Sequence, residues 1–346
     1  MLEREEIVPN VGDFHCIEYL GAKLLIARGD DEKVRVFANT CRHRGASLKE
    51  GSGNCKKFRC PYHFWTYGLD GQLIVAPNFT DSNGEALIND SNKEEYGLAE
   101  VESGTWGGFI FVRLGEDTQT LTQHLGSFVD ALASHKLEDM RCARKVVYDM
   151  DANWKCFIEN YVDLYHIPYV HKDSLARWKT TEYHQTKPHG HERIGFAVHE
   201  GSQLLLPGED YVGFPAMPQI DADKKGGTFF STLPPSFLMT ISNDGALVFQ
   251  SEPVSAGKSR LIVSSLFPKS YFERDDFESL SENYYRRNSM VVIEDKDVTN
   301  RQYEGIQSPF ARVARLCNDE ARLNIFANWI LDQVIGADDK EAMAAE

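Results

Sequence analysis

The sequence predicts an α+β protein of two domains, an all-β domain followed by a domain in which helices flank a sheet. Its 346 residues suit two domains better than one. The first third contains short apolar runs separated by turn residues, a pattern typical of a small sandwich or barrel. Helical periodicity begins after a polar stretch at 115–120, so the predicted domains are 1–116 and 117–346.

The strands expected in the first domain are short runs rich in aliphatic and aromatic residues: Lys23–Ala27, Val34–Ala38 and Phe109–Arg113. Glycine, asparagine and aspartate lie between these runs, as in Gly51–Asn54 and Leu69–Gly71, because they accept the backbone angles of tight turns. The first domain is therefore expected to contain several short strands joined by turns.

The second domain begins and ends with helical periodicity. Its apolar residues recur every three or four positions at Leu121, Leu125, Phe128 and Leu132, and again at Leu323, Phe326, Ile330 and Val334, which we expect to pack against a sheet. Between them, Asn153–His166 predicts a helix that Pro168 ends or bends, because proline lacks a donor and clashes with the preceding turn. Strands and loops are expected from about Tyr183 to Phe267.

The composition excludes several classes of protein. With 37 basic and 52 acidic residues the net charge is −15, which argues against a nucleic-acid partner, because binding phosphate requires clustered Lys and Arg. The chain has no run of about 18 apolar residues, and Met1–Pro9 lacks the layout of a signal peptide. Seven cysteines, an odd number, indicate reduced thiols or metal ligands. We therefore expect a soluble cytoplasmic protein without a membrane partner.

Two cysteines and two histidines form the first candidate metal site. Cys41 and His43 are separated by one residue, and Cys60 and His63 by two, with sixteen residues between the pairs. Two cysteines and two histidines also make a common structural zinc set, but zinc fingers usually pair cysteine with cysteine and histidine with histidine. Mixed pairs favour a Rieske [2Fe–2S] cluster, in which two thiolates hold one iron and two imidazoles hold the other.

The stretch Asn39–Gly71 resembles the Rieske domain of ring-hydroxylating and related non-haem iron oxygenases. The resemblance covers nearly the whole chain, and it implies a Rieske [2Fe–2S] domain followed by a helix-grip catalytic domain of the Bet v1/START type with an antiparallel sheet. Two features depart from the family. Phe64 stands where the family usually has glycine. Cys41 comes early in the chain, so we expect either that the start of the gene is placed too late or that the subunit lacks an N-terminal arm that contacts its neighbour.

The cluster is expected to have a low reduction potential. High-potential Rieske proteins carry an extra pair of cysteines that clips the two loops together, whereas Arg44 follows His43 here and Cys55 alone cannot form the clip. Phe64 cannot donate a hydroxyl hydrogen bond to the cluster. Fewer hydrogen bonds to the sulfurs stabilise the reduced cluster less, which suits passing electrons onward.

The second candidate site lies within residues 152–175. His166 and His171 are five residues apart, about 140° around an ideal helix, so the two rings can meet only if Pro168 breaks the helix. Two histidines and one carboxylate form the facial triad of non-haem Fe(II) enzymes. The carboxylate must come from elsewhere, and the segment 291–298 offers three candidates: Glu294, Asp295 and Asp297.

The resemblance assigns roles to these residues. It implies that Asp295 is the third iron ligand, with Asp297 as the alternative, and that Asp163 is an acid that joins His166 to a Rieske histidine, His63, of a neighbouring subunit. Such a bridge implies a head-to-tail ring, most simply a homotrimer. Asn160 and Tyr161 are the pocket candidates, because they lie on the expected iron-bearing helix.

The activity that the resemblance implies is that of a terminal oxygenase. Dioxygen and supplied electrons would hydroxylate, or N- or O-demethylate, a small organic substrate. The chain has no G-x-G-x-x-G fingerprint and no plant-type cluster motif, so NAD(P)H would act only through a separate flavin or iron–sulfur reductase, with or without a ferredoxin.

The sequence leaves the substrate class open. The sequence segments 159–175 and 294–309 are similar to those of choline and betaine monooxygenases. A cationic substrate would suit a cage of aromatic side chains, for which the candidates are Tyr161, Trp178, Phe230 and Phe237. Arene cis-dihydroxylation is the alternative reaction. Two interpretations of another class are a non-catalytic electron-transfer and ligand-binding protein, and a zinc-stabilised interaction module.

Overall fold

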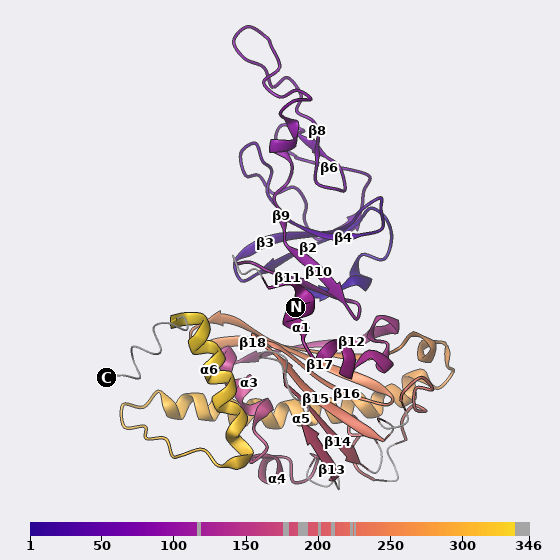
Figure 1. Ribbon diagram of the computed structural model, residues 1–346, viewed down its shortest axis with the longest axis vertical. Helices are drawn as coiled ribbons and strands as arrows, with labels where there is room; N and C mark the ends of the chain where they lie inside the picture. The colour runs from indigo at the N-terminus through magenta and orange to yellow at the C-terminus, as the bar shows by residue number, and fades with distance from the viewer. Residues whose placement is uncertain are drawn as a thin grey trace. The chain divides into compact units, whose positions relative to one another are not determined.

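The chain folds into two compact units, Met1–Gln119 and Thr120–Glu346. The structure, a computed structural model, describes residues 1–115, 119–175, 180–185, 193–199, 202–208, 212–221, 224 and 226–335. The unit boundary falls three residues after the boundary expected from the sequence. Figure 1 shows short strands joined by loops in the first unit and a sheet with helices in the second.

Unit 1 is built from three antiparallel sheets, as expected for an all-β domain. The sheets have the strand orders β1-β11-β10, β5-β2-β3-β4-β9 and β6-β7-β8. Their bounds are β1 (Glu3–Arg4), β2 (Asp13–Tyr19), β3 (Ala22–Arg28), β4 (Val34–Ala38), β5 (Ser52–Asn54), β6 (Phe58–Arg59), β7 (Thr66–Tyr67), β8 (Leu73–Val75), β9 (Glu100–Val101), β10 (Ser103–Trp106) and β11 (Phe109–Val112). The three expected runs thus form β3, β4 and β11.

The central strand β3 explains why its sequence is continuously apolar. Leu25 and Ala27 belong to one buried cluster, whereas Leu24 and Ile26 belong to another, because successive side chains point to opposite faces of a strand. Both faces of the five-stranded sheet are therefore covered. The first cluster also contains Cys41 and Cys60, so the loops that carry these cysteines are anchored in the core of unit 1.

Unit 2 contains a seven-stranded antiparallel sheet with helices around it. The sheet order is β12-β18-β17-β16-β15-β14-β13. The strands are β12 (Met140–Met150), β13 (Thr180–Gln185), β14 (Arg193–His199), β15 (Gly227–Leu233), β16 (Phe237–Ser242), β17 (Gly245–Ser255) and β18 (Lys258–Pro268). The helices are α1 (Leu121–Leu125), α2 (Phe128–Ala131), α3 (Trp154–Val162), α4 (Ile167–Val170), α5 (Phe277–Ile306) and α6 (Ala321–Ile335).

Helices α3 and α5 cover one face of this sheet, and Figure 1 shows α5 lying across the strands. Tyr161 of α3 contacts Phe249 of β17, with ring centroids 5.5 Å apart, and Tyr284 of α5 contacts Phe267 of β18 at 5.0 Å. On the opposite face, Phe128 of α2 packs on Phe237 of β16. Every residue of β16 is buried, because both faces of the sheet are covered at its centre.

Two helical expectations need correction. The helix expected over 153–166 ends at Val162, and Asp163 already has an extended backbone with ψ 126°. Pro168 does not end a helix but lies in the first turn of α4, where its missing N–H is not needed. Of the apolar residues expected to pack along α6, Phe326 is buried against Trp154, whereas Val334 is 78% exposed.

Helix α5 is the longest helix at 30 residues, and its composition is polar. Among the described residues, no helix has the length and apolar character that a membrane crossing requires.

Candidate metal centres and the adjoining cavity

The two cysteine–histidine loops of unit 1 close with the same backbone pattern. In each loop the cysteine N–H donates to the carbonyl five residues ahead, and the cysteine carbonyl accepts from the N–H four residues ahead. The four bonds are Cys41 N to Ala46 O (2.8 Å), Gly45 N to Cys41 O (2.9 Å), Cys60 N to Trp65 O (2.8 Å) and Phe64 N to Cys60 O (3.1 Å). Both loops thus present a cysteine and a histidine from equivalent turns.

These turns bring the four predicted cluster ligands together. Cys41 and Cys60 are 3% and 1% exposed, whereas His43 and His63 are only partly buried. The Nδ1 atoms of the two histidines lie 3.1 Å apart. Two buried thiols and two imidazole nitrogens that face each other fit the donor set of a Rieske cluster, in which the thiolates would hold one iron and the imidazoles the other.

Tyr67, on β7, is a neighbour of the cluster site that the sequence did not reveal. Its hydroxyl oxygen accepts from the Arg42 N–H at 3.1 Å and lies 3.2 Å from Cys41 Sγ, so it could donate its proton to a thiolate at that position. Burial and the nearby cysteines raise the pKa of Tyr67, which keeps the hydroxyl protonated as a donor. Phe64 has no hydroxyl group that could donate to the cluster, but the Tyr67 hydroxyl lies where it could do so. The signal in the sequence was a tyrosine in a core strand, where a buried hydroxyl needs a partner.

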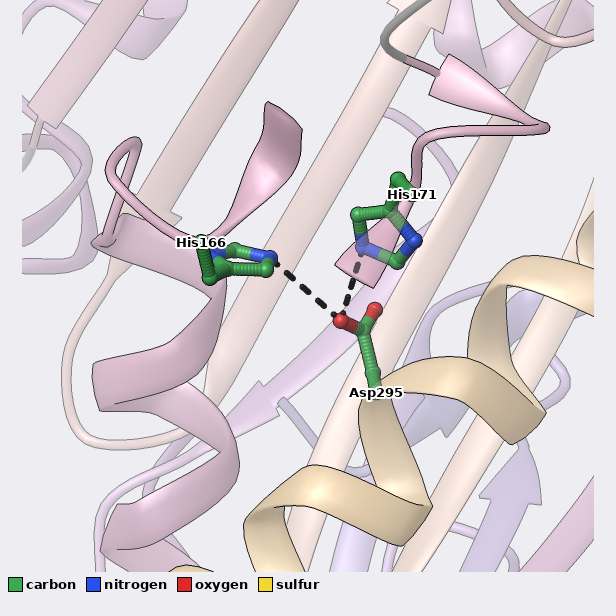
Figure 2. A group of neighbouring side chains, drawn as sticks. All are labelled: His166, His171 and Asp295. Carbon is green, nitrogen blue, oxygen red and sulfur yellow. Dashed lines mark hydrogen bonds and ion pairs between the residues drawn. The ribbon is translucent and has the colours of Figure 1, made fainter. Parts of the chain in front are cut away.

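Three side chains converge in unit 2, as Figure 2 shows. His171 Nε2 lies 2.9 Å from Asp295 Oδ1, and His166 Nε2 lies 3.5 Å from the same oxygen. One ligand atom from each residue lies within 4.8 Å of the other two. Two imidazoles and one carboxylate around a common point fit the facial triad of non-haem iron.

The short helix α4 places both histidines. His166 is its N-cap and His171 is its C-cap, so the two rings leave opposite ends of a single four-residue turn. The His171 N–H donates to the carbonyl of Ile167 at 3.1 Å, which closes this turn. The prediction that Pro168 allows the two histidines to meet is correct in outcome, but the proline acts by starting α4.

Each histidine has a carboxylate on the side away from Asp295. Glu294 Oε2 lies 2.7 Å from His171 Nδ1 and accepts from Ser174 Oγ at 2.8 Å. A carboxylate at Nδ1 fixes the proton there and leaves Nε2 as the free lone pair, the usual arrangement of a metal-binding histidine. At His166 the corresponding partner is Asp163, whose Oδ2 lies 3.3 Å from Nδ1.

Helix α5 decides which acid reaches the histidines. Asp295 is 8% exposed and accepts from Asn160 Nδ2 at 2.7 Å, whereas Asp297 is exposed. Glu294 contacts His171 at Nδ1, the ring nitrogen on the side away from Asp295. The structure therefore brings Asp295 to the convergence point and leaves Asp297 outside it.

The charges at this point are strongly coupled. Burial alone would raise the pKa of Asp295, but His166 and His171 outweigh it and lower that pKa. Burial alone would lower the pKa of His166, but Asp163 and Asp295 raise it to about 9. In the absence of a cation the carboxylates therefore favour a protonated His166, and a divalent metal would take the place of that proton.

A cavity of about 470 Å³ adjoins the three residues. Asn160 and Tyr161, the predicted pocket residues, both line it, and Tyr161 Oη lies 2.9 Å from Thr240 Oγ1. Of the aromatic-cage candidates, Phe230 also lines the cavity, whereas Phe237 packs on the opposite face of the sheet and Trp178 lies outside the described residues. The cavity wall also includes Arg287, which the sequence did not single out.

Both units match known families. Residues 137–336 match the family described as "Ring hydroxylating alpha subunit (catalytic domain)", and residues 2–87 match "Rieske [2Fe-2S] domain". The carnitine monooxygenase oxygenase subunit of Acinetobacter pittii (strain PHEA-2) is 32% identical over 190 residues, 52% of this chain and 50% of that protein. The chloroplastic choline monooxygenase of Spinacia oleracea is 27% identical over 310 residues, 88% of this chain and 64% of that protein. The chain thus spans about half the length of the first relative and 64% of the second.

Solved structures establish the fold. A quaternary ammonium Rieske monooxygenase in complex with L-carnitine superposes with a TM-score of 0.69 at 22% identity, covering 89% of this chain and 78% of the other. Naphthalene 1,2-dioxygenase with indole bound gives a TM-score of 0.67 at 21% identity, covering 89% of this chain and 75% of the other.

The repeated turn around the cysteines generates a prediction about stability. Gly45 and Phe64 occupy equivalent positions with φ of 74° and 58°, and a bulky residue in this left-handed region costs about 1–2 kcal/mol. Phe64→Gly should therefore raise the free energy of unfolding by about 1 kcal/mol. Gly45→Ala should lower it by a similar amount, because its Cβ would meet no atom within 4 Å and only the backbone angle changes. Calorimetric unfolding of the cluster-loaded proteins checks both signs, and equal signs would refute the shared-turn interpretation.

The position of Asp295 generates a prediction about metal content. Asp295→Ala should lose the mononuclear iron and keep the cluster, because a buried ligand is removed while unit 1 is unchanged. Asp297→Ala, an exposed acid of the same helix, is the matched control and should keep both. Iron and sulfide analysis would show iron falling from about three to about two per chain with sulfide constant. Iron loss in the Asp297 variant instead would overturn the choice of ligand.

Proposed function

Because the chain belongs to the ring-hydroxylating alpha-subunit family, we propose that it is the terminal oxygenase component of a multicomponent monooxygenase. The two family domains bring a [2Fe–2S] cluster and a mononuclear iron. The observation that carries the proposal is the convergence of His166, His171 and Asp295 at the wall of a 470 Å³ cavity. An electron-transfer protein that only bound a ligand would need no such triad.

The proposed reaction inserts one oxygen atom into a C–H bond of a small organic substrate. A C–H bond breaks, a C–O bond forms, and the second oxygen atom leaves as water, which requires two electrons and two protons in addition to dioxygen. The metal centres, when bound, would supply electrons and bind dioxygen. Where the oxidised carbon is an N-methyl group, the hydroxylated product loses formaldehyde, and the net result is demethylation.

Quaternary ammonium compounds are the proposed substrate class. This class is supported by the similarity to monooxygenases of carnitine and choline. Tyr161 and Phe230 could face a cationic group across the cavity.

The residues of unit 2 would position the chemistry. His166, His171 and Asp295 would hold the iron, with Glu294 keeping the proton on His171 Nδ1 and Asn160 fixing Asp295 by a 2.7 Å hydrogen bond. The apolar side chains of the cavity, Val162, Ile194, Phe230, Phe249 and Val291, would exclude water from the bound substrate. Cys41, His43, Cys60 and His63 would hold the cluster.

Asp163 would connect two subunits in this proposal. It lies 3.3 Å from His166 on the side away from Asp295, and its Oδ1 accepts from the Tyr165 N–H at 2.6 Å. We propose that its carboxylate also reaches His63 of a neighbouring subunit, which gives a head-to-tail ring of three. Inter-subunit electron transfer has been described for a quaternary ammonium Rieske monooxygenase of the same fold, and this supports the bridge.

Electrons would come from a separate partner. We propose a flavin and iron–sulfur reductase that oxidises NAD(P)H, with or without a ferredoxin, because the chain carries no dinucleotide fingerprint. The cytoplasm is the proposed compartment. None of the seven cysteines, all of which the structure describes, forms a disulfide, which suits a reducing environment.

Arene cis-dihydroxylation is the second candidate. The apolar wall of the cavity would also accept an aromatic ring, and naphthalene 1,2-dioxygenase shares the fold. In that reaction both oxygen atoms would enter the product with two electrons and two protons, and no water would form.

Product analysis separates these reactions. The iron-replete protein is reduced chemically and exposed to oxygen with choline, glycine betaine, carnitine, methoxybenzoates and simple arenes, and products are read by mass spectrometry. Gain of one oxygen, or loss of a methyl group, supports the monooxygenase. Gain of two oxygens and two hydrogens supports the dioxygenase, and no turnover with both metal centres loaded favours the electron-transfer interpretation.

The bridging role of Asp163 predicts a specific defect. Asp163→Ala should keep both metal centres yet lose steady-state turnover by at least about 100-fold, because electrons would no longer pass between subunits. Asp173→Ala removes an exposed acid of the same segment and is the control. The measurement is the rate of cluster reoxidation together with product formation on the substrate that product analysis identifies. Turnover near the wild-type rate in the Asp163 variant would exclude the bridge.

A further inference from the structure

Arg287 is a buried cation in the wall of the cavity. It lies on α5, eight residues before Asp295, and is only 3% exposed. Its side chain lines the same cavity as the three convergent residues. The adjacent Arg286, by contrast, is exposed.

The guanidinium has no acidic partner among the described residues. Its Nη1 donates to Asn288 Oδ1 at 3.3 Å, and its Nε is buried without a hydrogen-bond partner. The nearby acids are already engaged. Asp295 contacts both histidines and Asn160, and Glu294 is held by His171 and Ser174.

A buried arginine without a counter-charge is rare because removing the ion from water is costly. Asp295, Tyr161 and Glu294 favour the charged form from a distance, but burial outweighs them and lowers the pKa of Arg287 to about 10. The side chain is therefore still cationic at neutral pH. Its charge and its unpartnered Nε together point to an anionic group as the partner of this side chain.

We propose that Arg287 binds a carboxylate of the substrate. The planar guanidinium offers paired N–H donors that match the two oxygens of a carboxylate. The apolar side chains Phe230 and Phe249 would hold the rest of the molecule. This inference rests on the proposed function, because it takes the ligand of this cavity to be the molecule that is oxidised. It narrows the quaternary ammonium class to zwitterions such as betaines, and disfavours choline, which has no anionic group.

Ligand binding tests this inference without requiring turnover. Isothermal titration calorimetry on the metal-loaded protein compares two matched pairs, glycine betaine with choline and benzoate with benzamide. Each pair differs chiefly in the carboxylate. The variants are Arg287→Met, which keeps an unbranched apolar stem and removes the charge, Arg287→Lys, which keeps the charge, and Arg286→Met as the control. Iron content and the thermal midpoint are measured for every variant.

The wild-type protein should bind the carboxylate member of at least one pair about 10- to 100-fold more tightly. Arg287→Met should abolish that preference, Arg287→Lys should retain part of it, and Arg286→Met should leave it unchanged. No preference in the wild type overturns the inference. A preference that survives in Arg287→Met also overturns it, because the carboxylate would then bind elsewhere, for example at the iron.

If Arg287→Met fails to load metal, Arg287→Gln takes its place with the same expected loss. The outcome is separable from that of the proposed function. A carboxylate preference without any product would leave the role of Arg287 intact and refute the oxygenase. Turnover without a carboxylate preference would support the oxygenase and refute the role proposed for Arg287.

Discussion

The meeting of two imidazoles on one carboxylate oxygen, Asp295 Oδ1, is the interaction on which the candidate site of unit 2 depends. A buried carboxylate is stable only with partners, and here it has His166, His171 and Asn160. These partners come from the end of α3 and from both ends of α4, while Asp295 comes from the middle of α5. The site therefore requires α3 and α5 to lie side by side, and the seven-stranded sheet holds both helices on one face.

The sheet also creates the space that the site needs. Its centre is buried on both faces, with α2 on one side and α3 and α5 on the other. Phe230, Thr240 and Phe249 share the face that carries the helices, because antiparallel neighbours in register point to the same side. The cavity lies between this face and the side chains of His166, His171 and Asp295. Apolar side chains such as Phe230 and Phe249 alternate in its wall with polar ones, and among the polar ones the buried cation Arg287 would bear most on what binds.

In unit 1 the same backbone turn occurs twice, once in each loop that carries a cysteine and a histidine. The cysteine of each loop is held by two backbone hydrogen bonds and buried in the core, whereas the histidines lie closer to the surface. A cluster in this place would be shielded on its sulfur side and accessible on its histidine side, which suits electron exchange with a partner. Tyr67 adds a hydroxyl toward Cys41, so the cluster would not lack side-chain hydrogen bonds, contrary to what Phe64 alone suggested.

The sequence by itself determined the parts that depend on short spacings. Two mixed cysteine–histidine pairs predict a cluster site because each pair needs only one tight turn, and alternating or continuous apolar runs identified β3, β4 and β11. The end of α3 at Val162 was not predictable, because Asp163 leaves the helix to contact His166, and that contact outweighs local helical periodicity. Tertiary structure also decided between Asp295 and Asp297 for the convergence point: they lie two residues apart on α5, and only packing against a segment 124 residues away selects one. The burial of Arg287 without a counter-charge is likewise a property of packing, since nothing in its neighbourhood along the chain distinguishes it from Arg286.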